Sequence, residues 1–183
     1  MGPPDTATAP AAVLRDIYGR MDGTGKLLAD NCSGFIKETL RNFKISFSDG
    51  KADALIDQIM APASEWMYLS KGSDGASAVK AAAAGYLVLA VLKAADHVQY
   101  SMDPDTKKYT IPDHRNHGHV SVVLPRADKD GYPYLISGSI VAAGKSNGSK
   151  SVRGVWRNVD AVNVKYYRSA IVFGGLVSPN FSR

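Results

Sequence analysis

Residues 85–93, GYLVLAVLK, mark the point at which the character of the sequence changes. The run is continuously apolar, follows a glycine and is rich in Val and Leu, so it predicts a buried strand. Before it, apolar residues recur at helical spacing, and after it they alternate or form short runs. Helices followed by a series of strands indicate an α+β fold, in which the N-terminal helices pack on an antiparallel β-sheet.

Four helices are predicted before this strand. In the first three, apolar side chains repeat every three or four residues, and Asp30-Asn31 supply capping side chains for the second. The fourth is rich in alanine, the strongest helix former. The predicted ranges are 11–21, 32–43, 51–60 and 77–84. We expect residues 1–10, which are rich in Pro, Ala and Thr, to be loose.

Three further strands are predicted after it: HVSVVLP (119–125), YPYLISGSIVAA (132–143) and VKYYRSAIVF (164–173). The glycine- and serine-rich stretch GKSNGSKSVRG (144–154) reads as a flexible basic loop. We find no internal repeat and no linker. The 183 residues are therefore expected to form a single domain, 1–183.

The composition excludes several classes of protein. Hydrophobic residues make up 45% of the chain and charged residues 21%, which is typical of a globular domain. No apolar run approaches the roughly 18 to 20 residues of a membrane span, so we expect no membrane insertion. The N-terminal MGPPDTATAPAAVLRD does not resemble a Sec signal peptide, so we expect any export to use another route.

Positive charge is concentrated at the C-terminal end. Residues 141–183 hold 7 Lys or Arg and 1 Asp, whereas the whole chain carries a net charge of +5. Such an excess fits nucleic acid, an anionic envelope polymer, an acidic partner protein or simply a solvated face. Because the basic residues are spread singly rather than clustered, we expect no nucleic acid partner.

Cys32 is the only cysteine, and it lies at the predicted start of the second helix. It cannot form an internal disulfide. The positive end of the helix dipole favours a thiolate, which is a good nucleophile. The small residues Ser33 and Gly34 leave room for a backbone or a substrate beside the thiol. The alternative is a small buried residue without a catalytic role, which is common for free cysteines.

A cysteine nucleophile needs a base, and His119 is the best placed of the four histidines. It opens a predicted strand directly after a glycine, so its imidazole is held rigidly and can face a helix N-terminus across a cleft. His97 lies near the end of the first strand. The rival interpretation is a metal site made of Asp113, His114, His117 and His119. Its spacing matches no closed zinc pattern, and we expect neither a metal nor a cofactor.

Two motifs carry a resemblance to a known family. NCSGFIK (31–37) resembles the signature around the nucleophile of NlpC/P60-type cysteine peptidases, and GHVSVV (118–123) resembles the motif around their base. The chain is also similar to the first family of type VI secretion amidase effectors. The matching segments keep their order over most of residues 29–167: DNCSGFIK, the Ala-rich helix into GYLVLAVLK, GHVSVV, YPYLISGSI, and GKSNGSKSVRGVW followed by KYY.

The resemblance implies a papain-like NlpC/P60 fold and an antibacterial toxin. Such effectors are made in the bacterial cytoplasm, delivered by type VI secretion and active in the periplasm of a rival cell. They cleave the D-glutamyl–meso-diaminopimelate bond of peptidoglycan stem peptides. Carried over, Cys32 is the nucleophile, His119 the base, and Ser137 the group that orients the histidine, with Ser139 as the second choice. A cognate immunity protein and a secretion tube component are implied as partners, and we expect a monomer.

Several points remain open in the sequence. The stretch at about 96–115 is longer than the family pattern, and the additional cysteines of some relatives are absent. A housekeeping wall hydrolase, an acyltransferase on the same scaffold and a non-enzymatic basic envelope-binding module are the alternatives. The basic residues Lys145, Lys150, Arg153 and Arg157 are candidates to attract stem carboxylates. Trp66 and Trp156 are expected in the core rather than as substrate platforms.

Overall fold

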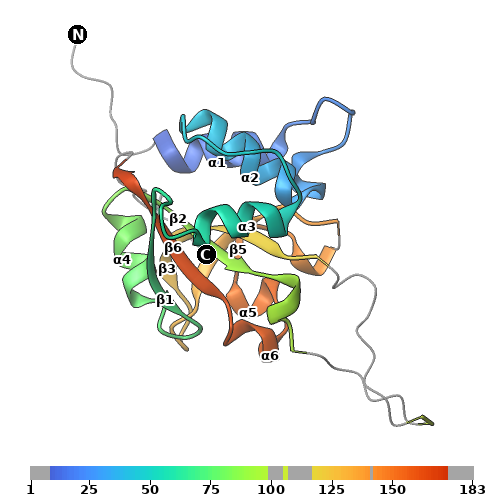
Figure 1. Cartoon of the computed structure of the whole chain (residues 1–183), viewed down its shortest axis with the longest axis vertical. Helices are drawn as coiled ribbons and strands as arrows, with labels where there is room; N and C mark the ends of the chain where they lie inside the picture. Colours follow the sequence, from blue (N-terminus) through green and yellow to red (C-terminus); the bar gives the residue numbers. More distant parts are fainter. Residues whose placement is uncertain (1–8, 99–104, 107–116, 141, 173–183) are drawn as a thin grey trace.

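The computed structural model describes residues 9–98, 105–106, 117–140 and 142–172 (Figure 1). Its centre is a six-stranded sheet in the order β1-β6-β2-β3-β4-β5, and every neighbouring pair is antiparallel. The strands are β1 (Trp66–Lys71), β2 (Tyr86–Leu92), β3 (His119–Ala127), β4 (Pro133–Ser137), β5 (Ser146–Ser151) and β6 (Lys165–Val172). The α-helices are α1 (Ala9–Gly19), α2 (Cys32–Asn42), α3 (Ala52–Met60), α4 (Ala76–Ala83), α5 (Val152–Val155) and α6 (Asn158–Ala161). Short 3-10 turns are η1 (Leu28–Asp30), η2 (Ala94–Asp96) and η4 (Ala142–Gly144).

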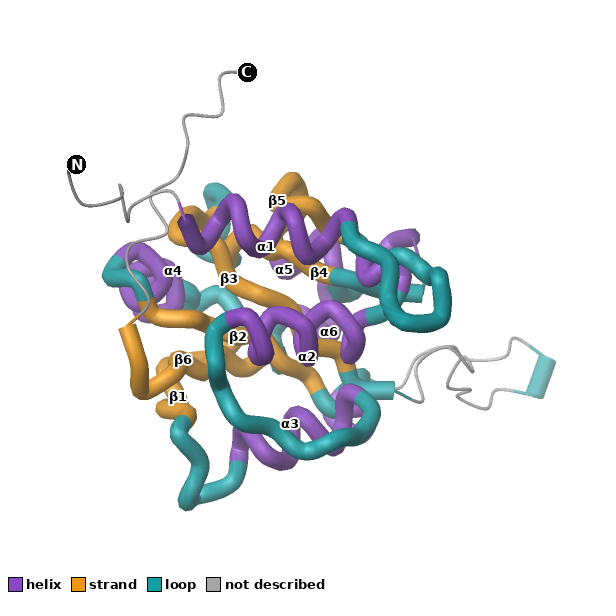
Figure 2. Tube along the Cα trace, turned by 90° about the horizontal axis from the view of Figure 1, so that it is seen from above, coloured by secondary structure: helices purple, strands orange, loops and turns teal. Residues whose placement is uncertain are grey.

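The three N-terminal helices lie together over the sheet, in front of the strands in Figure 2. Helix α2 packs on β3, α1 on β4, and α3 on β3 and β1. All residues of 87–92 in β2 and 120–124 in β3 are buried, so both faces of the central strands are covered. Helix α4, whose Ala78 and Ala82 are fully buried, also packs on β2 and β3 and supplies a second cover. The predicted papain-like α+β fold, with N-terminal helices on an antiparallel sheet, is confirmed.

The prediction of a flexible loop at 144–154 is wrong, because this stretch contains β5 and the start of α5. The hydroxyl of Ser146, which is buried, donates to the carbonyl of Leu135 at 2.6 Å and accepts from the backbone N–H groups of Gly148 and Lys150. An edge strand that is held by such hydrogen bonds needs few apolar side chains, so the hydrophobic pattern does not reveal it. The edge strand β1 was not predicted for a related reason, since its outward side chains are half exposed.

The predicted strand 132–143 is too long, since β4 ends at Ser137. A Cβ atom added to Gly138 would lie 2.6 Å from the carbonyl oxygen of Leu28, so the chain here passes directly against the residues that lead into α2. The backbone N–H of Ser139 then donates to the carbonyl of Ala29 at 2.9 Å. The chain therefore leaves the sheet to pair with η1, which ties the end of β4 to the start of α2.

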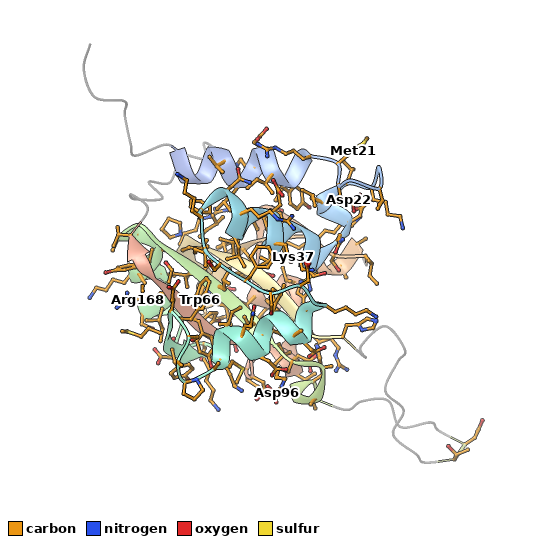
Figure 3. All side chains as sticks on the ribbon, turned by 45° about the horizontal axis from the view of Figure 1, so that its top comes forward. Met21, Asp22, Lys37, Trp66, Asp96 and Arg168 are labelled. Atoms are coloured by element: carbon orange, nitrogen blue, oxygen red, sulfur yellow. The ribbon has the colours of Figure 1, made fainter. Side chains whose placement is uncertain are left out.

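The remaining expectations concern the termini, the long loop and the tryptophans. Most of residues 1–10 and of 96–115 lie outside the described residues, although Ala9 already belongs to α1. Trp156 is 5% exposed and belongs to the core, as expected. Trp66 is partly buried and lies on the edge strand β1, near Arg168 of the neighbouring strand β6 (Figure 3). No helix within the described ranges combines the length and apolar character that a membrane crossing requires.

Candidate active site

Cys32 is the first residue of α2, and the side chain of Asn31 caps this helix. The Oδ1 atom of Asn31 accepts from the backbone N–H of Gly34 at 2.9 Å and from the hydroxyl of Ser33 at 3.2 Å. A Cβ atom on Gly34 would lie 2.6 Å from the Asn31 amide. Gly34 therefore makes room for the helix cap rather than for another backbone or a substrate.

The sulfur of Cys32 contacts the backbone of β3. The N–H of Val120 donates to Sγ at 3.2 Å, and the thiol donates to the carbonyl of Val120 at 3.4 Å. Burial raises the pKa of Cys32 to about 12; the Val120 N–H opposes this shift, and the negative charge of Asp53 adds to it. Burial therefore outweighs the tendency of the helix start to favour a thiolate, and the raised pKa corresponds to a neutral thiol in the resting protein.

His119 is the first residue of β3, and its ring is fixed from two sides. Its Nε2 atom lies 2.7 Å from the hydroxyl oxygen of Ser137, which is fully buried in β4. Ser137 in turn accepts from the hydroxyl of Ser121 at 2.8 Å. The ring meets that of Trp156 edge to face, with centroids 5.0 Å apart. The structure thus brings the first choice for an orienting group, Ser137, onto the histidine.

Burial also lowers the pKa of His119 to about 4; the charge of His97 acts in the same direction, and the backbone of Gly144 opposes it. The imidazole is therefore neutral at neutral pH and can accept a proton. Together with the neutral thiol of Cys32, this describes a resting pair that carries no charge.

Asp53 of α3 anchors the segment that presents His119, a role that no sequence pattern indicates. Its Oδ2 atom accepts from the N–H of Gly118 at 2.7 Å, and its Oδ1 atom accepts from the N–H of Ala94 at 2.9 Å. A Cβ atom on Gly118 would lie 2.7 Å from Oδ1, so the close approach requires glycine. One carboxylate thus holds both the residue just before His119 and the chain that leaves β2.

Cys32 and His119 line the same cleft, which has a volume of about 470 Å³. Ser139, the second choice for the orienting group, also lines it, together with Trp156. The wall also contains His97, Arg157 and Asp160, besides other polar residues. The cleft therefore combines the thiol of Cys32, the imidazole of His119 and a separate polar cluster. Of this cluster, the sequence analysis singled out only Arg157 as a candidate for substrate binding.

The other candidate residues lie as follows. Each of the four basic residues has a partner: Lys145 pairs with Asp30, Lys150 donates to the carbonyls of Ala142 and Ala143, Arg153 pairs with Asp130, and Arg157 pairs with Asp160. Of these four, only Arg157 lines the cleft. His117 is exposed at the cleft, while Asp113 and His114 lie outside the described residues. Within the described ranges, no three metal-binding side chains converge.

An antiparallel sheet with helices on it, and a cleft shared by a cysteine at a helix start and a histidine at a strand start, define the papain-like class of α+β proteins. No family model matches the chain. Over 140 residues it is 33% identical to the peptidoglycan amidase Tse1 of Pseudomonas aeruginosa, an alignment that covers 75% of this chain and 74% of Tse1. The chain therefore belongs to the family of Tse1, and the resemblance to the type VI secretion amidase effectors is confirmed.

Proposed function

We propose that the protein is a peptidoglycan amidase of the type VI secretion effectors, with Cys32 as nucleophile, His119 as base and Ser137 as the group that orients His119. The observation that carries this proposal is the shared cleft, in which the histidine is hydrogen-bonded to a buried serine and the cysteine begins a helix. Membership of the Tse1 family supports the reaction class.

The first step is acyl transfer to sulfur. In the tautomer that this mechanism requires, Nε2–H of His119 donates to Ser137, which leaves Nδ1 to take the proton of Cys32 while the sulfur attacks the carbonyl of the stem peptide. The oxygen of Ser137 suits this role, because Ser121 also donates to it and its own hydrogen faces the carbonyl of Gly138 at 3.5 Å. Because the resting pair is neutral, the proton moves when the substrate arrives.

The oxyanion requires nearby N–H donors, and the start of α2 supplies them. The first N–H groups of a helix have no acceptor within the helix. The cap of Asn31 occupies the N–H of Gly34, so the backbone N–H groups of Cys32 and Ser33 are the available donors. His119 then gives its proton to the leaving amine, and water, activated by the same imidazole, hydrolyses the thioester.

The proposed bond lies between D-glutamate and meso-diaminopimelate, and the proposed site of action is the periplasm of a target cell after type VI delivery. An immunity protein and a secretion tube component complete this proposal. Its test is mass spectrometry of muropeptides released from purified sacculi. We expect fragments cut at this bond with the wild-type protein and with the exposed control variant S149A, and none with C32A or H119A. Release by folded C32A would falsify the mechanism.

A non-enzymatic binding module is the second candidate, and the raised pKa of the Cys32 thiol is the observation that favours it. The same experiment separates the two. A binding module would sediment with sacculi and release no fragments at any enzyme concentration, whereas an amidase releases fragments in proportion to time. An acyltransferase would instead join the acyl fragment to an added amine, which changes the product mass.

A further inference from the structure

A second polar cluster lines the cleft beside Cys32 and His119, and Asp160 of α6 is its centre. The side chain of Asp160 is 2% exposed. Its Oδ1 atom accepts from the N–H of Val98 at 2.7 Å and from Nη2 of Arg157 at 3.2 Å. Its Oδ2 atom accepts from Nε of Arg157 at 2.7 Å and lies 3.2 Å from Nδ1 of His97. Both oxygens are thus occupied, so this carboxylate orients its neighbours and does not repel an incoming anion strongly.

The ring of His97 turns one nitrogen toward Asp160, at ion-pair distance but without a hydrogen bond of good geometry, and presents the other. Since Nδ1 faces Asp160, Nε2 is the free edge, and no described residue is hydrogen-bonded to it. The side chain of His97 is 11% exposed and lines the cleft. His119 lines the same cleft. A second histidine therefore lines the cleft, in addition to His119.

Arg157 is fixed in a similar way. Its Nε and Nη2 atoms are used by Asp160, and Nη2 also donates to the carbonyl of Val98 at 2.6 Å. The Nη1 atom has no hydrogen-bond partner in the part of the chain that the structure describes, and the residue lines the cleft. A guanidinium held on two sides has little freedom to lose when a ligand binds to its third. Its remaining N–H groups suit a carboxylate.

We propose that His97 and Arg157 form a subsite that binds a free carboxylate of the stem peptide next to the scissile bond. This inference rests on the proposed function. A D-glutamyl residue that is linked through its γ-carboxyl keeps a free α-carboxylate, and diaminopimelate carries further carboxylates, so a negative charge lies within a few bonds of the bond that is cut. In this arrangement Nε2 of His97 and Nη1 of Arg157 both face the substrate carboxylate, while Asp160 lies against the other edge of each side chain.

The test compares three synthetic stem peptides: the acid, the analogue amidated at the D-glutamyl α-carboxyl, and the analogue amidated on diaminopimelate. The variant is H97N, whose side-chain amide can replace Nδ1 beside Asp160 but has nothing in the place of Nε2. For the acid, we expect kcat/KM of H97N to fall about tenfold. For the analogue that lacks the recognised carboxylate, H97N and wild type should agree within about twofold.

The pattern identifies the source of the carboxylate, because only one of the two amides should abolish the effect of H97N. An equal loss on all three peptides, or no loss on any, overturns the subsite. R157K serves as a second variant if H97N does not fold, and it should also lose the preference for the acid.

Failure of the proposed function is seen separately. If the wild type cleaves none of the peptides, calorimetry on C32A still measures whether the acid binds more tightly than the amides and whether C32A/H97N removes that difference. Equal binding of the three peptides by C32A overturns the subsite as well.

Discussion

The sulfur of Cys32 lies 3.2 Å from the backbone nitrogen of Val120, the residue that follows His119 along β3. The proposed nucleophile at the start of α2 is therefore in direct contact with β3, the strand that carries the proposed base, although Cys32 and His119 are far apart in the sequence. The contact also places the thiol against a backbone carbonyl in a partly buried setting, and desolvation there stabilises its neutral form. The chemistry then depends on the substrate to complete the charge separation between sulfur and imidazole.

The first prediction concerns the reactivity of Cys32 in the free protein. Because burial raises its pKa to about 12, alkylation by iodoacetamide should still accelerate above pH 9. The same thiol in urea-unfolded protein should titrate near its ordinary value of about 8.5. Cys32 is the only cysteine, so labelling reports it alone. A labelling rate that levels off by pH 7 in the folded protein would contradict the neutral resting pair.

The second prediction separates Ser137 from Ser139 as the partner of His119. Ser137 lies 2.7 Å from Nε2, so S137A removes the hydrogen-bond partner that fixes the ring, and kcat/KM should fall about tenfold. S139A changes a residue of the cleft wall and should cost less. Urea unfolding of both variants controls for stability. The assignment fails if S139A is the more damaging of the two at equal stability.

The third prediction is a dependence of stability on pH that originates in His119. Its pKa is about 4 in the folded protein against an ordinary value of 6.5, so the unfolded chain binds the proton first as the pH falls. The stabilisation is complete above pH 6.5 and is lost between pH 6.5 and 4, by about 3 kcal/mol. Urea unfolding at pH 7, 5.5 and 4.5 measures it.

H119Q is the matched variant for this measurement, because all carboxylates and the other three histidines are the same in both proteins. The difference in unfolding free energy between wild type and H119Q should shrink across this window. Parallel curves for the two proteins would mean that His119 is not buried in its neutral form.

The sequence revealed those features that depend on apolar pattern or on a single conspicuous residue. The buried strands β2 and β3 are continuous apolar runs, and Cys32 stands out as the only thiol beside a recognisable motif. The strand β5 escaped prediction because the buried hydroxyl of Ser146, rather than an apolar face, holds it. Its serines and glycines have the composition of a loop.

The polar contacts of the cleft could not be predicted for a different reason. Asp53 reaches Gly118, and Asp160 reaches His97, only after helices and strands far apart in the chain have packed together. Neither carboxylate has a local sequence signal, because a single Asp on a short helix usually faces solvent. The raised pKa of Cys32 is also a tertiary property: the helix start alone favours a thiolate, and burial outweighs it.

The last prediction assigns Asp53 a positioning role. D53A leaves the N–H groups of Gly118 and Ala94 without their acceptor, which should cost about 2–3 kcal/mol of stability and loosen the start of β3. D57A, on the same helix, removes an exposed pair with Lys93 and should cost less than about 1 kcal/mol. The activity of D53A should fall with the mobility of His119, and D53N, which keeps one acceptor oxygen, should lie between D53A and wild type.

Asp53 also acts through its charge, which contributes to the raised pKa of Cys32. Alkylation of Cys32 in D53N should therefore become faster at a given pH, because the sulfur ionises more readily when the nearby negative charge is gone. In D53N the rate of alkylation should therefore rise while the rate of turnover falls. Slower alkylation together with slower turnover would mean that Asp53 acts only by holding the backbone and does not influence the thiol through its charge.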